Sequence, residues 1–183
     1  MRIIRGSHKG KILRPPTNLP VRPTTDMAKE GIFNVIEHTW EMDGLNILDL
    51  FAGTGSISLE FCSRGAGRVT AIDQNLRCTE WIQKAARDLG FSNLSVFRHD
   101  VFHYLHSLRL RYDIIFADPP FDLELLPTLP DLVFSRELLH PGGWFILEHP
   151  GEYDFSAHPR FLTHKTYGKV HFTIFAAEEP LGD

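Results

Sequence analysis

Apolar residues recur at helical spacing near the start of the chain. Thr24 or Thr25 can cap a helix whose first turn contains Asp26, because a hydroxyl accepts from a free N–H of the first turn. Five residues three or four positions apart would form its buried side: Ala28, Ile32, Val35, Ile36 and Trp40. The pattern therefore predicts an amphipathic helix that belongs to the core.

After this helix, short apolar runs alternate with amphipathic segments. Strands are predicted over residues 46–51, 68–72, 94–97, 112–117 and 143–148, and helices over 56–63 and 75–89. Such alternation is typical of a parallel sheet covered by helices. The last two apolar runs, 160–166 and 170–176, are joined at Gly168 tightly enough to be antiparallel. We expect an α/β fold with a Rossmann-like, mostly parallel seven-stranded sheet and a C-terminal antiparallel hairpin.

The first 23 residues have a different residue pattern from the rest of the chain. Residues 1–13 alternate apolar and basic residues around Gly6 and Gly10, which predicts a β-hairpin. Four prolines then favour an extended linker: Pro15, Pro16, Pro20 and Pro23. We expect residues 1–23 to form an extension and residues 24–183 to form the catalytic domain.

Charge is spread unevenly over the chain, whose net charge is -4. Residues 1–29 contain seven basic residues and one acid, a net of +6, which leaves -10 on the remainder. A basic arm on an acidic body favours contact with phosphates. The RNA-binding candidates are Arg2, Arg5, Lys9, Lys11 and Arg14. The alternative is a basic hairpin that is merely solvated.

Composition restricts the class of protein further. A length of 183 residues with 43% apolar and 23% charged residues is typical of one globular domain. We find no apolar run long enough to cross a membrane and no secretion signal, so we expect a cytoplasmic monomer. Cys62 and Cys78 lie in predicted helices without metal-ligand spacing. His99, His103 and His106 are explained by a short surface helix, and we expect no metal.

The first predicted strand runs into a glycine-containing turn. Asp49 precedes this turn, whose residues are Phe51, Ala52, Gly53, Thr54 and Gly55. Two glycines let the backbone turn sharply and let a ligand approach it closely. Nicotinamide, flavin and adenosylmethionine folds share this turn, but a third glycine would fall at Ser58. Asp49 favours S-adenosylmethionine, since its carboxylate can receive an ammonium and would repel a pyrophosphate.

The next two strands also end in acids, Asp73 and Asp100. Ligands of open parallel sheets lie across the carboxyl ends of the strands, so these acids would face one crevice. Asp73, beside Gln74, is placed to accept the ribose hydroxyls. Asp100 is placed to accept the adenine amino group, with Val101 covering the ring. Either acid can instead cap a helix.

The most specific motif is Asp118-Pro119-Pro120-Phe121, at the end of the fourth predicted strand. The Asp118 carboxylate and the Pro119 carbonyl can both accept from an amino group, and Phe121 can stack on its aromatic ring. Holding the amino hydrogens there aims the nitrogen lone pair at a methyl donor. The motif therefore predicts N-methylation of a nucleic-acid base.

Several separated motifs together resemble the RsmD-like bacterial methyltransferases that modify guanine N2 in small-subunit ribosomal RNA. They are residues 1–6, Lys9-Gly10, residues 22–26, Phe33-Asn34, residues 48–55, residues 63–66, residues 118–121, residues 141–143 and Tyr167-Gly168. The resemblance implies that Arg22, Pro23 and Thr24 border the cofactor and that the N-terminal hairpin contacts RNA.

Two residues depart from the family's pattern in the first helix. Lys29 stands where Arg is usual and would lose bidentate contact with phosphate. Gly31 stands where Ala is usual, at a cost of about 1 kcal/mol to the helix.

The motifs and the resemblance predict an enzyme that methylates guanine N2 in small-subunit ribosomal RNA, free or within a ribosomal particle. Adenine-N6 methylation of DNA or RNA is the first alternative, because such enzymes share the glycine turn and the Asp-Pro-Pro-Phe pocket. A non-catalytic RNA-binding assembly factor is the second. A Rossmann oxidoreductase and a protein-glutamine methyltransferase are less compatible with these motifs.

Overall fold

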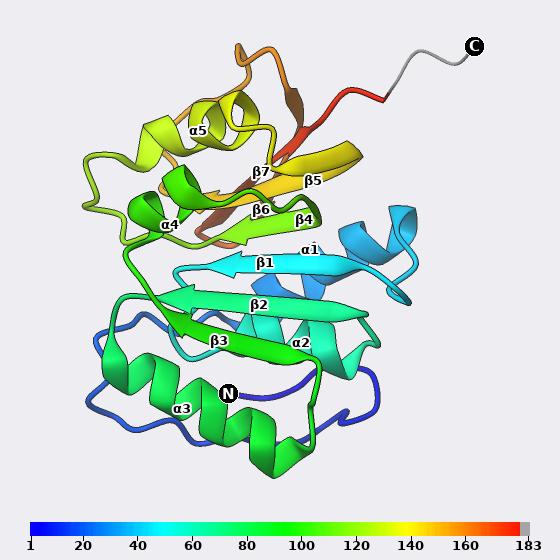
Figure 1. Cartoon of the computed structure of the whole chain (residues 1–183), viewed down its shortest axis with the longest axis vertical. Helices are drawn as coiled ribbons and strands as arrows, with labels where there is room; N and C mark the ends of the chain where they lie inside the picture. Colours follow the sequence, from blue (N-terminus) through cyan, green and yellow to red (C-terminus); the bar gives the residue numbers. More distant parts are fainter. Residues whose placement is uncertain (180–183) are drawn as a thin grey trace.

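A computed structural model describes residues 1–179 and shows a single seven-stranded sheet in the order β3-β2-β1-β4-β5-β7-β6 (Figure 1). The strands are β1 (Asn46–Leu50), β2 (Arg68–Asp73), β3 (Leu94–Arg98), β4 (Tyr112–Ala117), β5 (Leu139–His149), β6 (Phe161–Tyr167) and β7 (Val170–Ala176). The first five strands pair in parallel, whereas β7 is antiparallel to both β5 and β6. The predicted fold class is confirmed.

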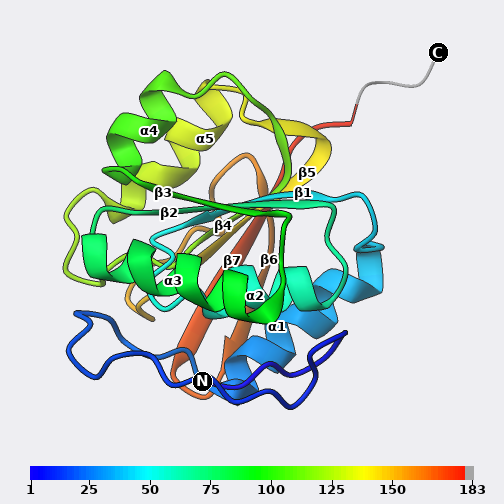
Figure 2. The same cartoon turned by 60° about the horizontal axis from the view of Figure 1, so that its bottom comes forward.

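Helices cover both faces of the sheet (Figure 2). One face carries α1 (Asp26–Thr39), α2 (Ser56–Ser63) and α3 (Leu76–Leu89), and the other carries α4 (Val101–Ser107) and α5 (Leu129–Ser135), which follows the short 3-10 helix η1 (Leu126–Thr128). Each face has its own apolar core, one around Phe33 and Phe61, the other around Leu105 and Phe145. Burial on both faces explains why β1 and β4 are almost continuously apolar.

Local sequence signals set the helix ends. Thr25 caps α1 by accepting from the Ala28 N–H, and Asn75 caps α3 by accepting from the Cys78 N–H. Gly90 ends α3 in the left-handed conformation, which glycine adopts without strain. These caps match the predicted helices within one residue.

The strand order places a ligand crevice at a defined point. The chain runs from β1 outward to β2 and β3, then crosses back to β4 on the other side of β1. Loops after β1 and β4 therefore leave the sheet in opposite directions, and a crevice opens between them at the carboxyl ends of the strands.

The N-terminal segment is packed on the domain rather than extended from it. The predicted hairpin is present. Arg2 and Ile12 form an antiparallel bridge, and the N–H groups of Ile3, Gly10 and Leu13 donate to the carbonyls of Lys11, Ile3 and Met1, respectively. Ile3 and Leu13 are buried against Leu59 of α2 and Leu89 of α3. Burial of these apolar residues attaches the hydrogen-bonded hairpin to the domain.

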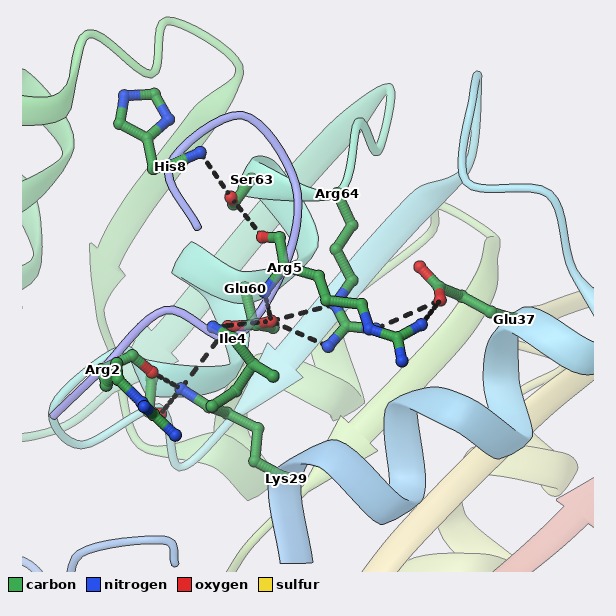
Figure 3. Close-up of polar contacts among 10 residues, drawn as sticks. Arg2, Ile4, Arg5, His8, Lys29, Glu37, Glu60, Ser63 and Arg64 are labelled. Atoms are coloured by element: carbon green, nitrogen blue, oxygen red, sulfur yellow. Dashed lines mark hydrogen bonds and ion pairs between the residues drawn. The ribbon is translucent and has the colours of Figure 1, made fainter. Parts of the chain in front are cut away.

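A buried charge cluster completes this attachment (Figure 3). The Glu60 carboxylate of α2 accepts from the backbone N–H groups of Ile4 and Arg5 and pairs with Arg64 and Lys29. Lys29 also donates to the Arg2 carbonyl and to the Ser56 hydroxyl. Its side chain is 1% exposed, so the expectation that residue 29 faces phosphate is wrong. Lysine fits here because three separate acceptors surround a single ammonium.

Candidate active site

The crevice at the carboxyl ends of the strands is a cleft of about 1100 Å³. The loops after β1, β2, β3 and β4 line it, together with the N-terminal linker and the start of α2 and α3. Fourteen predicted site residues lie on its walls: Arg22, Thr24, Asp49, Phe51, Ala52, Gly53, Thr54, Asp73, Gln74, Asp100, Val101, Asp118, Pro119 and Pro120. Pro23, Gly55 and Phe121 do not line it.

The turn after β1 is held in an unusual backbone conformation. Phe51 has a φ of 56° although it is not glycine, and Gly53 has a φ of 58°. The Gly53 N–H donates to Asp73 Oδ2 at 2.9 Å, and the Trp81 indole N–H donates to the Thr54 carbonyl at 2.9 Å. Contacts from β2 and α3 therefore fix the turn that forms the floor of the cleft.

Gly55 has a structural role at the start of α2. It is the N-cap residue with a φ of 76°, and a Cβ there would lie 2.8 Å from Ile82. Glycine is needed for both reasons. The residue supports the turn from behind, which explains why it does not reach the cleft.

Asp49 is a buried acid beneath the same turn. Its carboxylate accepts from the Ser58 hydroxyl at 2.6 Å. Burial raises the pKa of Asp49 to about 7, and the nearby Asp118 and Asp73 add to this effect. Ser58, which breaks the dinucleotide glycine pattern, is thus the hydrogen-bond partner of this acid. Its hydroxyl favours the ionised form that a cationic ligand would need.

Asp73 and Asp100 differ in the hydrogen bonds that their carboxylates accept. Asp73 accepts from two backbone N–H groups, those of Gly53 and Asn75, and so organises the turns around it. Asp100 is the N-cap of α4 and accepts from the His103 N–H at 2.9 Å. The capping alternative therefore describes Asp100, whose side chain nevertheless borders the cleft. Both carboxylates retain lone pairs for further donors.

The Asp118-Pro119-Pro120-Phe121 motif forms one wall of the cleft, directly after β4. Arg22 Nη2 lies 3.3 Å from Asp118 Oδ1 and 3.4 Å from Glu148 Oε1, at the carboxyl end of β5. Burial raises the pKa of Asp118 to about 6, against the lowering effect of Arg22. Burial and the neighbouring Asp118 raise the pKa of Glu148 to about 8. The two carboxyls and the guanidinium form one coupled group.

Phe121 does not present its ring to the cleft as the sequence suggested. The Arg22 guanidinium carbon lies 3.6 Å from the centre of the ring, so the guanidinium stacks on it. Arg22 lines the cleft and Phe121 does not. In this arrangement the Phe121 ring lies behind the Arg22 guanidinium and supports it.

The predicted RNA-binding residues separate into two groups. Arg2 pairs with Asp26 and Arg5 pairs with Glu37. In contrast, Lys9, Lys11 and Arg14 are exposed and form no ion pair among residues 1–179. The free positive charge of the N-terminal segment is therefore concentrated in residues 9–14.

Sequence reasoning missed Glu148, Arg77 and Arg98. Glu148 is the penultimate residue of β5, and Asp73 is the last residue of β2, so the search for acids at the carboxyl ends of strands that found Asp73 could have found Glu148. Arg77 and Arg98 line the cleft from α3 and β3, and exposed arginines carry no comparable pattern. His99, His103 and His106 are exposed, and within residues 1–179 no three or more His, Cys, Asp or Glu side chains are grouped so that they could hold a metal ion. Within those residues, no helix has the length and apolar character to span a bilayer.

Comparison with known proteins identifies the family. The family described as "Conserved hypothetical protein 95" matches residues 1–176. The chain belongs to this family, the RsmD family. The resemblance seen in the sequence motifs is confirmed.

Relatives in the RsmD family match most of the chain. YlbH of Bacillus subtilis is 32% identical over 182 residues, which cover 96% of this chain and 98% of YlbH. Ribosomal RNA small subunit methyltransferase D of Escherichia coli is 31% identical over 144 residues, 79% of this chain and 69% of that protein.

Solved structures show the same fold. The Escherichia coli protein yhhF superimposes with a TM-score of 0.84 at 28% identity and covers 98% of this chain and 99% of its own. An RNA methyltransferase from Salinibacter ruber, in complex with S-adenosyl-L-homocysteine, has a TM-score of 0.68 at 15% identity over 88% of this chain and 97% of its own. This member of the RsmD family thus has the fold of S-adenosylmethionine-dependent methyltransferases.

Proposed function

We propose that the chain transfers a methyl group from S-adenosylmethionine to the exocyclic N2 amino group of a guanine in small-subunit ribosomal RNA. The observation that carries the proposal is the position of Asp118-Pro119-Pro120 on the wall of a large cleft whose floor is the glycine turn. One wall can accept an amino group, and the floor can hold a methyl donor beside it.

The residues around the floor fit a cationic cofactor. Burial raises the pKa of Asp49, and the neighbouring carboxylates of Asp118 and Asp73 raise it further. A ligand with an ammonium and a sulfonium relieves this repulsion, whereas a dinucleotide pyrophosphate would increase it. Asp49 would receive the ammonium, Asp73 the ribose hydroxyls, and Asp100 with Val101 the adenine. When bound, adenosylmethionine supplies an electrophilic methyl group.

On the acceptor side, the chain's own residues orient the nucleophile. Asp118 and the Pro119 carbonyl accept the two amino hydrogens, which directs the nitrogen lone pair into the cleft. Two prolines restrict the backbone there and add no competing N–H donors. Because the pKa of Asp118 is about 6, the carboxylate is ionised at neutral pH and ready to accept.

The choice of guanine N2 in small-subunit RNA is supported by the RsmD-family match and by the name of the Escherichia coli relative. In this proposal residues 1–23 contact RNA, residues from 24 onward carry out catalysis, and the protein acts as a cytoplasmic monomer. Adenine-N6 methylation is the second candidate, because the same wall accepts any amino group attached to an aromatic ring.

Nucleoside analysis tests the proposal. Purified protein and labelled adenosylmethionine are incubated separately with small-subunit ribosomal RNA and with assembled small subunits from cells that lack the gene. Mass spectrometry of the digested nucleosides should show N2-methylguanosine. N6-methyladenosine would contradict the guanine assignment, and absence of any labelled nucleoside with either substrate would contradict the proposed function.

A further inference from the structure

Arg22 occupies an unexpected place in the cleft. Its guanidinium carbon lies over the Phe121 ring, 3.6 Å from the ring centre, and its Nη2 atom lies within hydrogen-bond reach of both Asp118 and Glu148. The side chain is 47% exposed, while that of Glu148 is 4% exposed. The guanidinium thus has one face on an aromatic ring, one edge on two carboxyl groups and the remainder open to the cleft.

Each of these contacts restricts the guanidinium differently. Stacking on Phe121 fixes the plane of the group, and the two carboxyl groups fix its rotation within that plane. Glu148 reaches it from β5 at the base of the wall, where the strand is rigidly paired with β4 and β7. Glu148 does not line the cleft, so it acts through Arg22 and Asp118.

A flat, fixed guanidinium at the cleft surface is a stacking platform. Nucleobases stack on arginine planes as they do on aromatic rings. A base whose amino group reaches Asp118 would pass beside Arg22, because both side chains line the same wall and are 3.3 Å apart. Phe121 is separated from the cleft by the guanidinium.

We propose that Arg22 is the surface on which the target base stacks, with Phe121 behind it and Glu148 as its positioning residue. This role lies on the acceptor side of the cleft and rests on the proposed base methylation. It differs from the cofactor-bordering role that the family resemblance implied for Arg22.

The decisive variant is Arg22→Lys, which keeps the charge and removes the plane. We expect it to lower kcat/KM for RNA at least about tenfold, a size typical of one lost base-stacking contact. Adenosylmethionine affinity, measured by calorimetry, should stay within about twofold of wild type. Arg87→Lys on the exposed side of α3 is the matched control and should behave as wild type.

Three results of this experiment would overturn the proposal. Wild-type activity of Arg22→Lys would reduce Arg22 to a charge that neutralises Asp118. Higher activity of Arg22→Ala would make the guanidinium a cover that the base must displace. Loss of cofactor affinity in either variant would place Arg22 on the cofactor side.

Glu148→Ala tests the positioning half of the proposal, because it removes the oxygen that Arg22 contacts. Phe121 should shift the Arg22 side-chain NMR resonances upfield in the wild type, and the variant should lose much of that shift. Its effect on kcat/KM should not add to that of Arg22→Lys, because both act on one guanidinium. An unchanged Arg22 shift, or fully additive effects, would contradict the role of Glu148. Glu148→Gln, which keeps an acceptor oxygen, should recover part of both properties, while Glu152→Ala serves as an exposed control.

A readout without turnover separates this inference from the proposed function. A short single-stranded RNA carrying one 2-aminopurine reports base stacking through its fluorescence, and it requires no knowledge of the methylated position. If no RNA is methylated, the proposed function fails. The platform is then supported by fluorescence that differs between wild type and Arg22→Lys, and is contradicted by identical fluorescence.

Discussion

At the scale of single residues, the cleft is built from acids that folding places in unfavourable surroundings. Asp49 and Glu148 are buried and Asp118 is largely buried, and loss of hydration raises the pKa of each. Elevated pKa values at several neighbouring carboxyls are a common property of functional sites. The arrangement costs stability in the free protein, and cationic groups such as Arg22 or a bound ligand offset that cost.

Asp49→Asn should stabilise the free protein at high pH. The pKa of Asp49 is about 7 in the folded protein and 3.8 ordinarily, so the folded state holds a proton that the unfolded chain has released. Its contribution to stability therefore falls as pH rises through this window. Urea unfolding should show a gain of roughly 2–4 kcal/mol at pH 8 and a smaller one at pH 5.

The same substitution should weaken adenosylmethionine binding at least about tenfold, because the ammonium loses its carboxylate. In the wild type, affinity should rise with pH up to about 7, since binding then requires no release of the Asp49 proton. The exposed Asp43→Asn variant removes the same charge and should change neither property. Equal stabilisation by both variants would point to overall charge instead of burial.

Asp118→Ala tests the acceptor wall. Removing a preorganised acceptor should lower turnover at least about a hundredfold while cofactor affinity changes little. Wild-type turnover should also fall as pH drops below about 6, where the carboxyl becomes protonated. Kinetics with labelled cofactor and calorimetry give the two quantities. Loss of cofactor binding by a folded Asp118→Ala protein would show that the roles are assigned wrongly.

At the scale of elements, the sequence predicted the helices and strands whose bounds depend on the local pattern of apolar residues. The helix over 56–63 and the strands over 112–117 and 170–176 have the predicted bounds, because each is a short, mostly buried segment that stands out in the sequence as an apolar run. The N-terminal hairpin was also predictable, and backbone hydrogen bonds join its two arms. The sequence did not show where the hairpin packs, because its apolar residues are buried by α2 and α3, which are distant in sequence.

In the site, too, features set by local sequence were predictable, and features set by contacts between distant residues were not. Asp49, Asp73 and Asp118 were predictable because each ends a strand, and parallel strands bring their carboxyl ends together. The stacking of Arg22 on Phe121 was not, since it joins residues 99 positions apart through side-chain geometry. Lys29 was misread for a similar reason, because its partner Glu60 lies in another helix.

Gly31 shows how one element limits another. Alanine would normally favour α1 by about 1 kcal/mol, but a Cβ at this position would lie 2.3 Å from the Tyr167 ring on β6. Gly31→Ala should therefore destabilise the protein by about 1–3 kcal/mol through overpacking. In a Tyr167→Ala background the same change should stabilise it by up to about 1 kcal/mol. Denaturant unfolding of the four proteins measures both effects, and a stabilising Gly31→Ala single variant would contradict the contact.

At the scale of the whole molecule, the basic N-terminal segment and the cleft both adjoin the same helix, α2. The N-terminal segment is fixed to α1 and α2 through Glu60, Lys29 and Arg64 (Figure 3). Lys29 also donates to Ser56, which lines the cleft. The segment is therefore a fixed part of the surface beside the site. RNA held by it would meet the cleft in one orientation.

Fewer basic side chains of the N-terminal segment are available to RNA than its composition implied, because Arg2 and Arg5 are already paired with acids. Lys9, Lys11 and Arg14 are exposed, and each phosphate contact contributes about -0.7 to -0.9 to the log-log salt slope of binding. Replacing all three with Gln should flatten that slope by roughly two units.

The triple variant should leave adenosylmethionine affinity unaltered, because phosphate contacts position the RNA without forming the cofactor crevice. Its matched control is the triple Gln variant of Arg109, Arg111 and Arg136, three exposed residues near the amino end of β4, opposite the cleft. This control removes the same charge, so it should lower affinity slightly and keep the slope. Equal flattening in both variants would mean that RNA responds to overall charge, and the N-terminal segment would then not be the phosphate-binding surface.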